Sequence, residues 1–463
     1  MQGSGNRLRL SDHCLFETCV APMAQLLPFC GWRFDLSQVG ALHEVTAPPT
    51  YDIDQDLQRV LYRRHPCNVV RLVRSRGEPG DTSSADRVIR ADDFLTLWKK
   101  EGVLLREHDD CFYVCETISP PDLSAVAKGI HDTESASRIT IIACLATPHN
   151  SLSTIRRVGT ACAKDVATEL ELLRCCKAAL TPVSGLLSVN NAGQRQSLSA
   201  QLRGAVAGLT PIEMLDDLGI RHRIWPLARP SISSELYTRL SHAEVILTGP
   251  SAQFSAALLF RDEYESSTKT SFPNDAAGLH LMALVPEDDP GIRFSYPVWV
   301  LSMIATSTTS TELLGTLQQA GFECQQVGSE NFAANDAVEL AALNACQPCL
   351  ALGTLDEAWL IVSHKGNAKL TSEPLLIARR RLADEITQLL RIPKTDVRIS
   401  TIADPSKARQ ERTTSLGALI LISPSSAADD LLELADDEFA QVLSNQTEMM
   451  APIPTGLVFS ILD

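Results

Sequence analysis

The sequence predicts a mixed α/β protein in which short strands alternate with helices along the chain. Two periodicities support this class. Cys111–Ile118 alternates with the two-residue repeat of a strand, and Lys164–Lys177 has the apolar spacing of an amphipathic helix. The composition agrees, because 44% of the 463 residues are hydrophobic and 21% are charged, as in proteins that bury a core. A chain of this length has room for two or three domains.

The first domain is expected to span residues 23–304, after an opening segment rich in Gly, Ser and Asn that offers little to bury. We therefore expect residues 1–22 to be an unpacked extension, or to precede a translation start at Met23. The predicted strands are Val69–Arg74, Cys111–Ile118, Ile139–Leu145, Gly185–Val189, His222–Pro226, Glu244–Leu247 and His280–Val285. The predicted helices are Asp54–Arg64, Ala91–Glu101, Lys164–Lys177, Ser233–Leu240 and Gln253–Glu265.

A smaller α+β lobe is expected over residues 305–463. The Thr/Ser-rich stretch Ala305–Thr311 predicts a hinge, and a helix with leucines at helical spacing follows it. The predicted elements of the lobe are strands Cys349–Gly353 and Glu357–Val362, helix Leu375–Leu390, strand Gly417–Ser423, helix Ala427–Phe439 and a last strand Gly456–Leu462.

The charge balance argues against a nucleic-acid partner, since the formal net charge is −15 and phosphate binding needs a concentrated basic face. The sequence has no long uncharged apolar run and no basic start followed by an apolar core, so we expect no membrane partner and a cytoplasmic location. The thirteen cysteines are then expected to be reduced thiols. Cys346 and Cys349 are spaced like a metal or redox pair but have no second pair nearby, so no metal site is expected.

The segment Ile246–Glu263 reads ILTGPSAQFSAALLFRDE, which predicts a strand, a turn and a helix. It resembles a segment that reads approximately ADGHHRYETALAYRDE in a bacterial and archaeal family called domain of unknown function 1015. The resemblance keeps the last charged triplet, Arg261–Glu263, and loses the ionisable groups of the turn. Aligned without gaps, the family's Asp, Gly, His, His, Arg and Glu fall on Gly249, Pro250, Ser251, Ala252, Gln253 and Ser255.

The resemblance extends along the chain from Met23, where the family's opening strand pattern begins. Its packing motifs are kept, in order, at Ala47-Pro48-Pro49, Pro66–Leu72, Phe112-Tyr113-Val114, Gly219–Trp225, Asp288–Gly291 and Pro454–Phe459. Its other polar motifs are changed. The family's P-H-E-R-T keeps His149 but has Asn150 and Ser151 in place of its charged pair, and a D-R pair becomes Thr168 and Glu169. A His-Arg pair becomes Val298 and Trp299, and two lysines near the end become Asn445 and Pro452.

The lost groups are cations and free backbone amides, which usually bind phosphate. The resemblance therefore implies a catalytically impaired family member, a pseudoenzyme that acts as a binding or regulatory subunit, without a cofactor. Its partner would be a paralogous family member or a second copy of this chain. The family turn is also similar to that of the ParB and sulfiredoxin-like superfamily, which includes a nucleotide-dependent free-serine kinase. That similarity implies a ParB/sulfiredoxin-like core in the first domain.

The alternative is a nucleotide-dependent, kinase-like enzyme that acts on a small molecule through a remodelled site and uses ATP or ADP with Mg²⁺. Its candidate catalytic residues are the surviving polar side chains of the family motifs, His149, Asp52, Arg71 and His222. The two histidines also fit hydrogen-bonded structural residues, and Arg71 fits a partner in an ion pair. Asp52 is shifted by Thr50 one residue out of register with the matching Asp56–Gln58, which would reverse the direction of its side chain. Asp288 and Asp289, before Pro290 and Gly291, are expected to form a turn.

Overall fold

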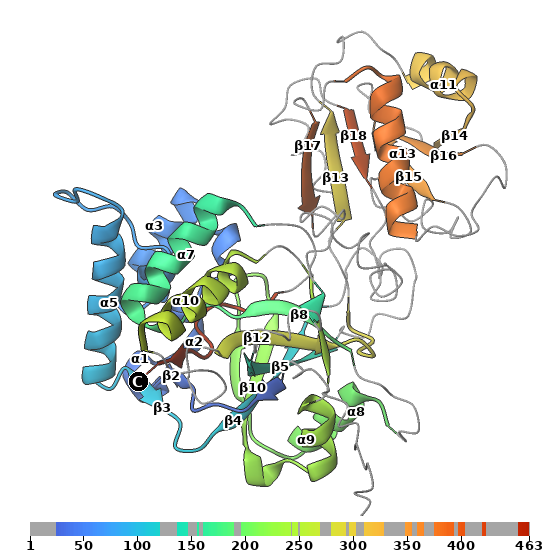
Figure 1. Cartoon of the computed structure of the whole chain (residues 1–463). Helices are drawn as coiled ribbons and strands as arrows, with labels where there is room; N and C mark the ends of the chain where they lie inside the picture. Colours follow the sequence, from blue (N-terminus) through green and yellow to red (C-terminus); the bar gives the residue numbers. More distant parts are fainter. Residues whose placement is uncertain are drawn as a thin grey trace, which may run out of the picture.

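The mixed α/β class is confirmed by a computed structural model of the chain (Figure 1). The structure describes residues 25–120, 137–146, 155–156, 161–188, 196–241, 243–248, 251–268, 279–292, 296–301, 310–327, 348–353, 359–364, 375–392, 397–402, 419–422 and 452–462. These residues form a nine-stranded sheet, a six-stranded sheet and two short strand pairs.

The nine-stranded sheet has the strand order β6-β11-β8-β12-β5-β4-β10-β9, and β1 pairs with β5 beside this path. Its pairs are antiparallel except β12 with β8 and β11 with β6. Its strands are β1 Gln25–Leu27, β4 Cys111–Ile118, β5 Ser137–Ala146, β6 Ile155–Arg156, β8 Val183–Ser188, β9 Ile212–Leu215, β10 Arg221–Ala228, β11 Glu244–Leu247 and β12 Leu279–Pro286. The predicted strands at 111–118 and 244–247 are confirmed to the residue, and four others agree within a few residues.

Helices pack against both faces of this sheet. Two apolar clusters lie on the two faces of the sheet. Side chains alternate along β4, so Cys111, Tyr113 and Cys115 belong to the first cluster and Phe112 and Val114 belong to the second. The first cluster joins the sheet to the N-terminal helices and α7, and the second joins it to α8 and α9 (Figure 1). The helices are α1 Leu36–Val39, α2 Leu42–Val45, α3 Gln55–Arg64, α4 Val70–Val73, α5 Ala85–Lys100, α7 Ala163–Cys176, α8 Leu198–Val206, α9 Ser234–Ser241 and α10 Ala252–Thr268, with 3-10 turns η1 Thr50–Asp52 and η3 Arg229–Ser231.

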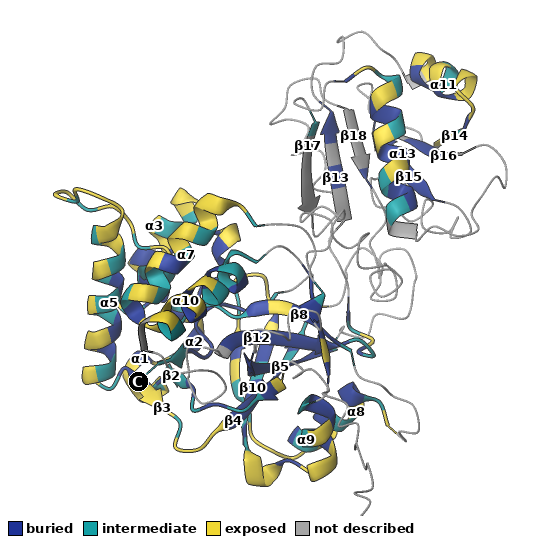
Figure 2. Ribbon diagram, in the orientation of Figure 1, coloured by how far each residue is buried: buried dark blue, intermediate teal, exposed yellow. Residues whose placement is uncertain are grey.

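Figure 2 shows the amphipathic character of these helices, since α5 is exposed on its outer side and buried where Ala91, Leu95 and Trp98 meet the core. The five helices predicted in the first domain are confirmed, with shifted ends. Among the described helices, none combines the length and apolarity needed to cross a membrane.

The predicted strand Val69–Arg74 is wrong, because this segment forms the short helix α4. The Asn68 side chain explains the difference. Its Oδ1 accepts from the N–H of Val70 at 3.0 Å, and its Nδ2 donates to the carbonyls of Glu44 and Thr46. A short apolar run fits a strand or a buried helical turn equally well, and this hydrogen-bonded asparagine favours the turn.

The six-stranded sheet is antiparallel and has the order β14-β16-β15-β18-β13-β17. Its strands are β13 Tyr296–Leu301, β14 Phe322–Val327, β15 Cys349–Gly353, β16 Trp359–His364, β17 Val397–Ile402 and β18 Leu419–Ile422, and helices α11 Ser310–Gln319 and α13 Leu375–Leu389 pack on it. β13 belongs to this sheet although it precedes residue 305, where the second lobe was expected to begin. The helix predicted at 427–439 lies outside the described residues.

The last described segment, residues 452–462, packs with the first sheet. Thr455 exchanges backbone hydrogen bonds with Ala47, and Phe459 with Trp32. Phe459 is fully buried, with its ring edge-on to that of Phe34 at 5.8 Å. Only Ser460–Ile461 of the predicted last strand forms a strand, β19, which pairs with β7 Ala178–Ala179, while β2 Trp32–Phe34 pairs with β3 Leu104–Arg106.

The turn after β12 offers a test of the fold. A Cβ added at Gly291 would lie 2.8 Å from the carbonyl carbon of Ser137 and 2.9 Å from Cα of Arg138, so backbone would have to move. We expect Gly291→Ala to lower the free energy of unfolding by about 1–3 kcal/mol, as measured by urea denaturation. Gly204→Ala in α8 is the control, because nothing lies within 4 Å of the added carbon and alanine favours a helix by up to about 1 kcal/mol. Equal effects of the two changes would contradict this placement of the turn.

Candidate functional site

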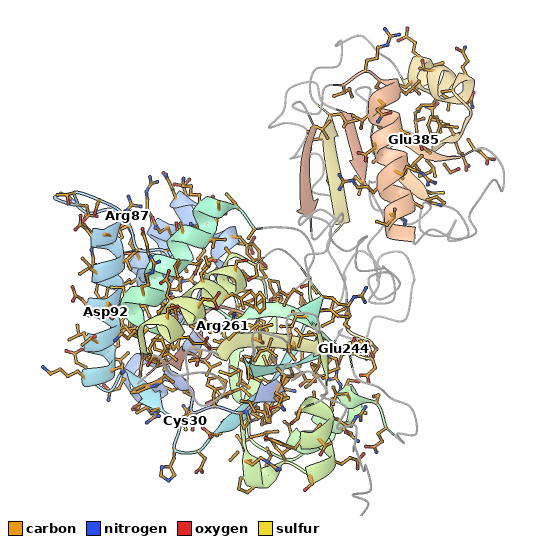
Figure 3. All side chains as sticks on the ribbon, in the orientation of Figure 1. Cys30, Arg87, Asp92, Glu244, Arg261 and Glu385 are labelled. Carbon is orange, nitrogen blue, oxygen red and sulfur yellow. The ribbon has the colours of Figure 1, made fainter. Side chains whose placement is uncertain are left out.

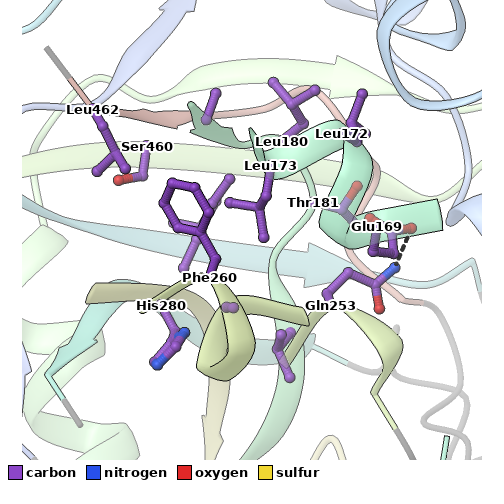
Figure 4. A pocket seen from close by; sticks show the side chains of 15 residues that line it. Glu169, Leu172, Leu173, Leu180, Thr181, Gln253, Phe260, His280, Ser460 and Leu462 are labelled. Carbon is purple, nitrogen blue, oxygen red and sulfur yellow. Dashed lines mark hydrogen bonds between the residues drawn. The ribbon is translucent and has the colours of Figure 1, made fainter. Parts of the chain in front are cut away.

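A small cavity lies between α7, α10 and strands β7, β8 and β12 (Figure 4). Its volume is about 40 Å³, enough for a few water molecules at roughly 10–15 Å³ each and far too small for a nucleotide. Most of its lining is apolar, and the polar side chains among the lining residues are those of Glu169, Thr181, Gln253, His280 and Ser460.

The polar centre of this cavity is a contact between Glu169 on α7 and Gln253 on α10. The Gln253 Nε2 donates to the Glu169 Oε1 at 3.2 Å, drawn as the dashed line in Figure 4. Burial raises the pKa of the Glu169 carboxyl to about 7, and the Arg74 charge and the Gln253 hydrogen bond oppose this rise. The resemblance assigns both positions to arginines of separate family motifs, and the fold brings them together from 84 residues apart.

Ser251 caps the start of α10. Its Oγ accepts from the N–H of Phe254 at 3.0 Å, the usual contact of an N-cap serine. The same hydroxyl donates to the Oε1 of Gln253 at 3.3 Å, so cap, amide and carboxyl form one chain of hydrogen bonds. A helix N-terminus can bind an anion through its free N–H groups, and here the side chain of Ser251 takes one of them.

The basic side chains beside the cavity are either uncharged or have partners within the chain. Burial, and next the charge of Arg261, lowers the pKa of His280 to about 3, so this imidazole is neutral at physiological pH. Arg261, labelled on α10 in Figure 3, is buried and forms an ion pair with Asp262 at 2.7 Å. Arg74 also carries a charge near Glu169, and its Nε donates to the carbonyl of Thr50 at 3.2 Å. The sequence predicted no site role for His280 or Arg74, because a single polar residue in or beside an apolar run carries no functional signal.

Two of the candidate catalytic residues have structural contacts. His222 is fully buried on β10, with Nδ1 3.3 Å from the Thr117 hydroxyl and Nε2 3.3 Å from an Asp216 carboxylate oxygen. Arg71 donates to the carbonyl of Tyr62 at 2.9 Å, and its guanidinium lies 4.5 Å from the centre of that ring.

The remaining predicted site residues are scattered. Asp52 is exposed at the end of η1. Ala252 and Ser255 are half-buried in the first turns of α10, Val298 is fully buried in β13, and Pro452 is half-buried near the chain end. The backbone of Trp299 pairs with Ile399 and Leu421. His149, Asn150, Ser151, Gly249, Pro250 and Asn445 lie outside the described residues.

No metal-binding cluster of three or more His, Cys, Asp or Glu side chains occurs among the residues that the structure describes. Cys349 is buried in β15 with a free thiol, and its expected pair member Cys346 lies outside the described segments.

Comparison with known proteins gives one family match. The model described as "Protein of unknown function (DUF1015)" matches residues 26–337. Similar solved structures include a free serine kinase in complex with ADP, at 7% identity and a TM-score of 0.30 over 67% of this chain and 85% of that one. A conserved hypothetical protein from Pyrococcus furiosus is similar at 9% identity and a TM-score of 0.29, over 66% of this chain and 93% of that one. No curated protein matches the chain.

The Glu169 carboxyl predicts a specific pH dependence of stability. Its pKa rises from 4.5 in the unfolded chain to about 7 in the folded protein. The folded state therefore binds this proton more tightly, and the resulting stability is complete below pH 4.5 and lost as pH rises through about 7. Glu169→Gln should remove this loss. The free energy of unfolding of the variant, relative to that of the unaltered chain, should therefore rise by about 2–3 kcal/mol between about pH 5 and pH 8.

Denaturant unfolding across this pH range measures the difference. Glu171→Gln, at an exposed position on the same helix, controls for the removal of one carboxyl. A constant difference between the Glu169→Gln variant and the unaltered chain would show that the carboxyl is solvated.

Proposed function

The chain belongs to the DUF1015 family, and we propose that it is a member that no longer binds an anionic ligand at the β11–α10 turn and acts as a binding or regulatory subunit. In this proposal the strand, turn and helix of a ParB/sulfiredoxin-like core remain as a scaffold. The scaffold is stable because its packing residues are kept. Its remaining polar groups form hydrogen bonds and ion pairs within this chain and do not bind a ligand.

The contact between Glu169 and Gln253 carries this proposal. The resemblance places a guanidinium at each of the two positions, and two guanidiniums converging on one cavity would suit a phosphate. Here an amide faces a carboxyl with a pKa of about 7, which is about half ionised at neutral pH, and its ionised form repels phosphate. The site has therefore exchanged two positive groups for one neutral and one acidic group.

Three further features support the same proposal. The α10 N-terminus is capped by Ser251, which competes with an anion for its N–H groups. The imidazole of His280 is neutral because of its burial. The cavity of about 40 Å³ leaves no room for a nucleotide without movement of α7 or α10.

The scaffold keeps the contacts that join α10 to α7. Arg174 on α7 donates through Nε to Glu263 on α10 at 2.9 Å, and Leu170 packs with Ala256 and Phe260. Kept motif residues such as Glu263 thus have structural roles in this chain. Among the changed residues, Ser251, Gln253 and Glu169 lie together at the start of α10 and beside the cavity. A kept fold does not by itself imply a kept activity, so the scaffold is free to act through binding in this proposal.

The proposal predicts that the chain does not bind nucleotides. Isothermal titration with ADP and ATP, with and without Mg²⁺, should give no binding heat. A family member that has the intact turn is the positive control. Tight, Mg²⁺-dependent binding by the unaltered chain would instead support the kinase-like alternative.

Two variants that restore family residues distinguish the contribution of the turn to nucleotide binding from that of Glu169. The first carries Gly249→Asp, Pro250→Gly, Ser251→His, Ala252→His and Gln253→Arg, and the second adds Glu169→Arg. The first should still bind ADP weakly, because Glu169 would pair with the introduced arginine, and the second should bind at least about tenfold more tightly. Equal affinities would show that Glu169 is not part of the site.

The subunit role predicts association with a second family chain. β9 is the last strand in the order of the nine-stranded sheet, and Leu215 and Leu218, at and just after its end, are exposed. Light scattering after size exclusion should detect a complex of this chain with itself or with a family member that has the intact turn. Leu218→Glu should weaken that complex, and Leu259→Glu, at an exposed position of α10, is the matched control. A chain that stays monomeric and binds neither partner would contradict the subunit role.

A further inference from the structure

A row of side chains crosses four strands on the face of the nine-stranded sheet that α8 and α9 cover. Glu213 of β9 pairs with Arg223 of β10, Arg223 pairs with Glu116 of β4, and Glu116 pairs with Ile139 of β5. Val114 belongs to the apolar cluster that joins the sheet to α8 and α9. Glu116 follows Val114 by two residues, so the strand period places Glu116 on the same face. The strand register therefore aligns acid, base, acid and an apolar residue in one line.

A cleft of about 350 Å³ lies over this row, within the range of about 300–1,000 Å³ that small-molecule sites occupy. Its other wall is the end of α8 and the loop that follows, from Val206 to Pro211. The indole Nε1 of Trp225 donates to the carbonyl of Leu209 at 3.0 Å, which fixes this loop over the sheet. The cleft is separate from the Glu169 cavity, because the two share no lining residue.

The charges of the cleft alternate in sign. The Nε of Arg223 donates to Glu213 at 2.6 Å, and its Nη1 lies 3.5 Å from the other carboxylate of the row, Glu116. Arg203 reaches Glu116 at 3.2 Å from the α8 side. The charged lining residues are thus two arginines and two glutamates, and their formal sum is zero.

The four charged groups differ in their contacts and exposure. Arg203 also donates to the carbonyl of Ser137 at 3.0 Å and to the buried Asp289 at 2.7 Å, so it holds α8 in place. Arg223 and Glu213 are 36% and 39% exposed, and their contact is an ion pair at the rim. Solvated ion pairs of this kind contribute little to stability, so their groups can exchange partners with a ligand at low cost.

These features select a ligand class. A simple anion at Arg223 would meet the repulsion of two carboxylates, and a simple cation at Glu116 would meet that of two guanidiniums. A molecule with both an ammonium and a carboxylate matches both signs at once. The carbonyl end of α8 adds a site that favours the ammonium, and Ile139, Val206 and Trp225 offer an apolar wall.

We propose that this cleft binds a small zwitterion with an apolar substituent, of the class of α-amino acids with apolar side chains. The carboxylate pairs with Arg223, the ammonium pairs with Glu213 and the end of α8, and the apolar group packs against Trp225. This site is independent of the proposed loss of anion binding at the β11–α10 turn.

The test uses matched probes on the full chain. L-leucine carries both charges, 3-methylbutylamine is the same skeleton without the carboxylate, and 4-methylpentanoate lacks the ammonium. Titration followed by NMR or calorimetry should show L-leucine binding at least about tenfold more tightly than either analogue. Arg223→Gln and Glu213→Gln should each weaken L-leucine binding by about tenfold, with Arg59→Gln, an exposed arginine on α3, as the control.

The outcomes are distinct. No binding of L-leucine up to millimolar concentration overturns the proposal, and so does equal affinity for the three probes, which would indicate apolar adsorption alone. Unchanged affinity in both cleft variants also overturns it. The comparison of probes needs only the unaltered chain, so it decides the question even if a variant fails to fold. Nucleotide titration has no bearing on these results, and failure at one site leaves the other intact.

Discussion

Two neighbouring aspartates at the end of β12 fix the position of α8 on the sheet. The Asp289 carboxylate is fully buried and accepts from the N–H groups of Ile139 at 3.0 Å and Gly291 at 2.8 Å, and from Arg203. Asp288 accepts from the N–H groups of Leu198 and Ser199 at the start of α8. A buried carboxylate is tolerated only when its oxygens are satisfied in this way, so this turn can adopt few other arrangements.

The arrangement around these aspartates determines what each face of the sheet can do. On the α8 face, Arg203 is held by Asp289 and by the carbonyl of Ser137, which places its guanidinium beside Glu116 in the charged row. Between α7 and α10, the groups available are a carboxyl with a raised pKa, an amide and a neutral imidazole. The α8 face therefore has a row of alternating charges beneath a cleft of about 350 Å³. The cavity between α7 and α10 is about 40 Å³ in volume and has few cationic groups.

Stability and site chemistry are separated along α10. The residues that pack it against α7, including Ala256 and Phe260, form an apolar cluster that does not depend on the polar turn. Changes at Ser251 and Gln253 can therefore alter ligand binding while the helix stays in place, because packing supplies most of a helix's stability in a folded protein. In our proposal, this separation is what allows the polar groups of the turn to change while the fold is kept.

The sequence by itself determined the mixed α/β class, most strands and helices of the first domain, and the turn at Asp288–Gly291. These follow from side-chain periodicity and turn residues, which act over a few positions of the chain. Its prediction of a strand at Val69–Arg74 was wrong, since the helical turn there depends on the hydrogen bonds of Asn68 to Glu44 and Thr46. Tertiary structure alone decided that Glu169 faces Gln253 and that Glu213, Arg223 and Glu116 form one row. Such contacts join residues far apart in the chain, and local pattern carries no information about which distant strands and helices will meet.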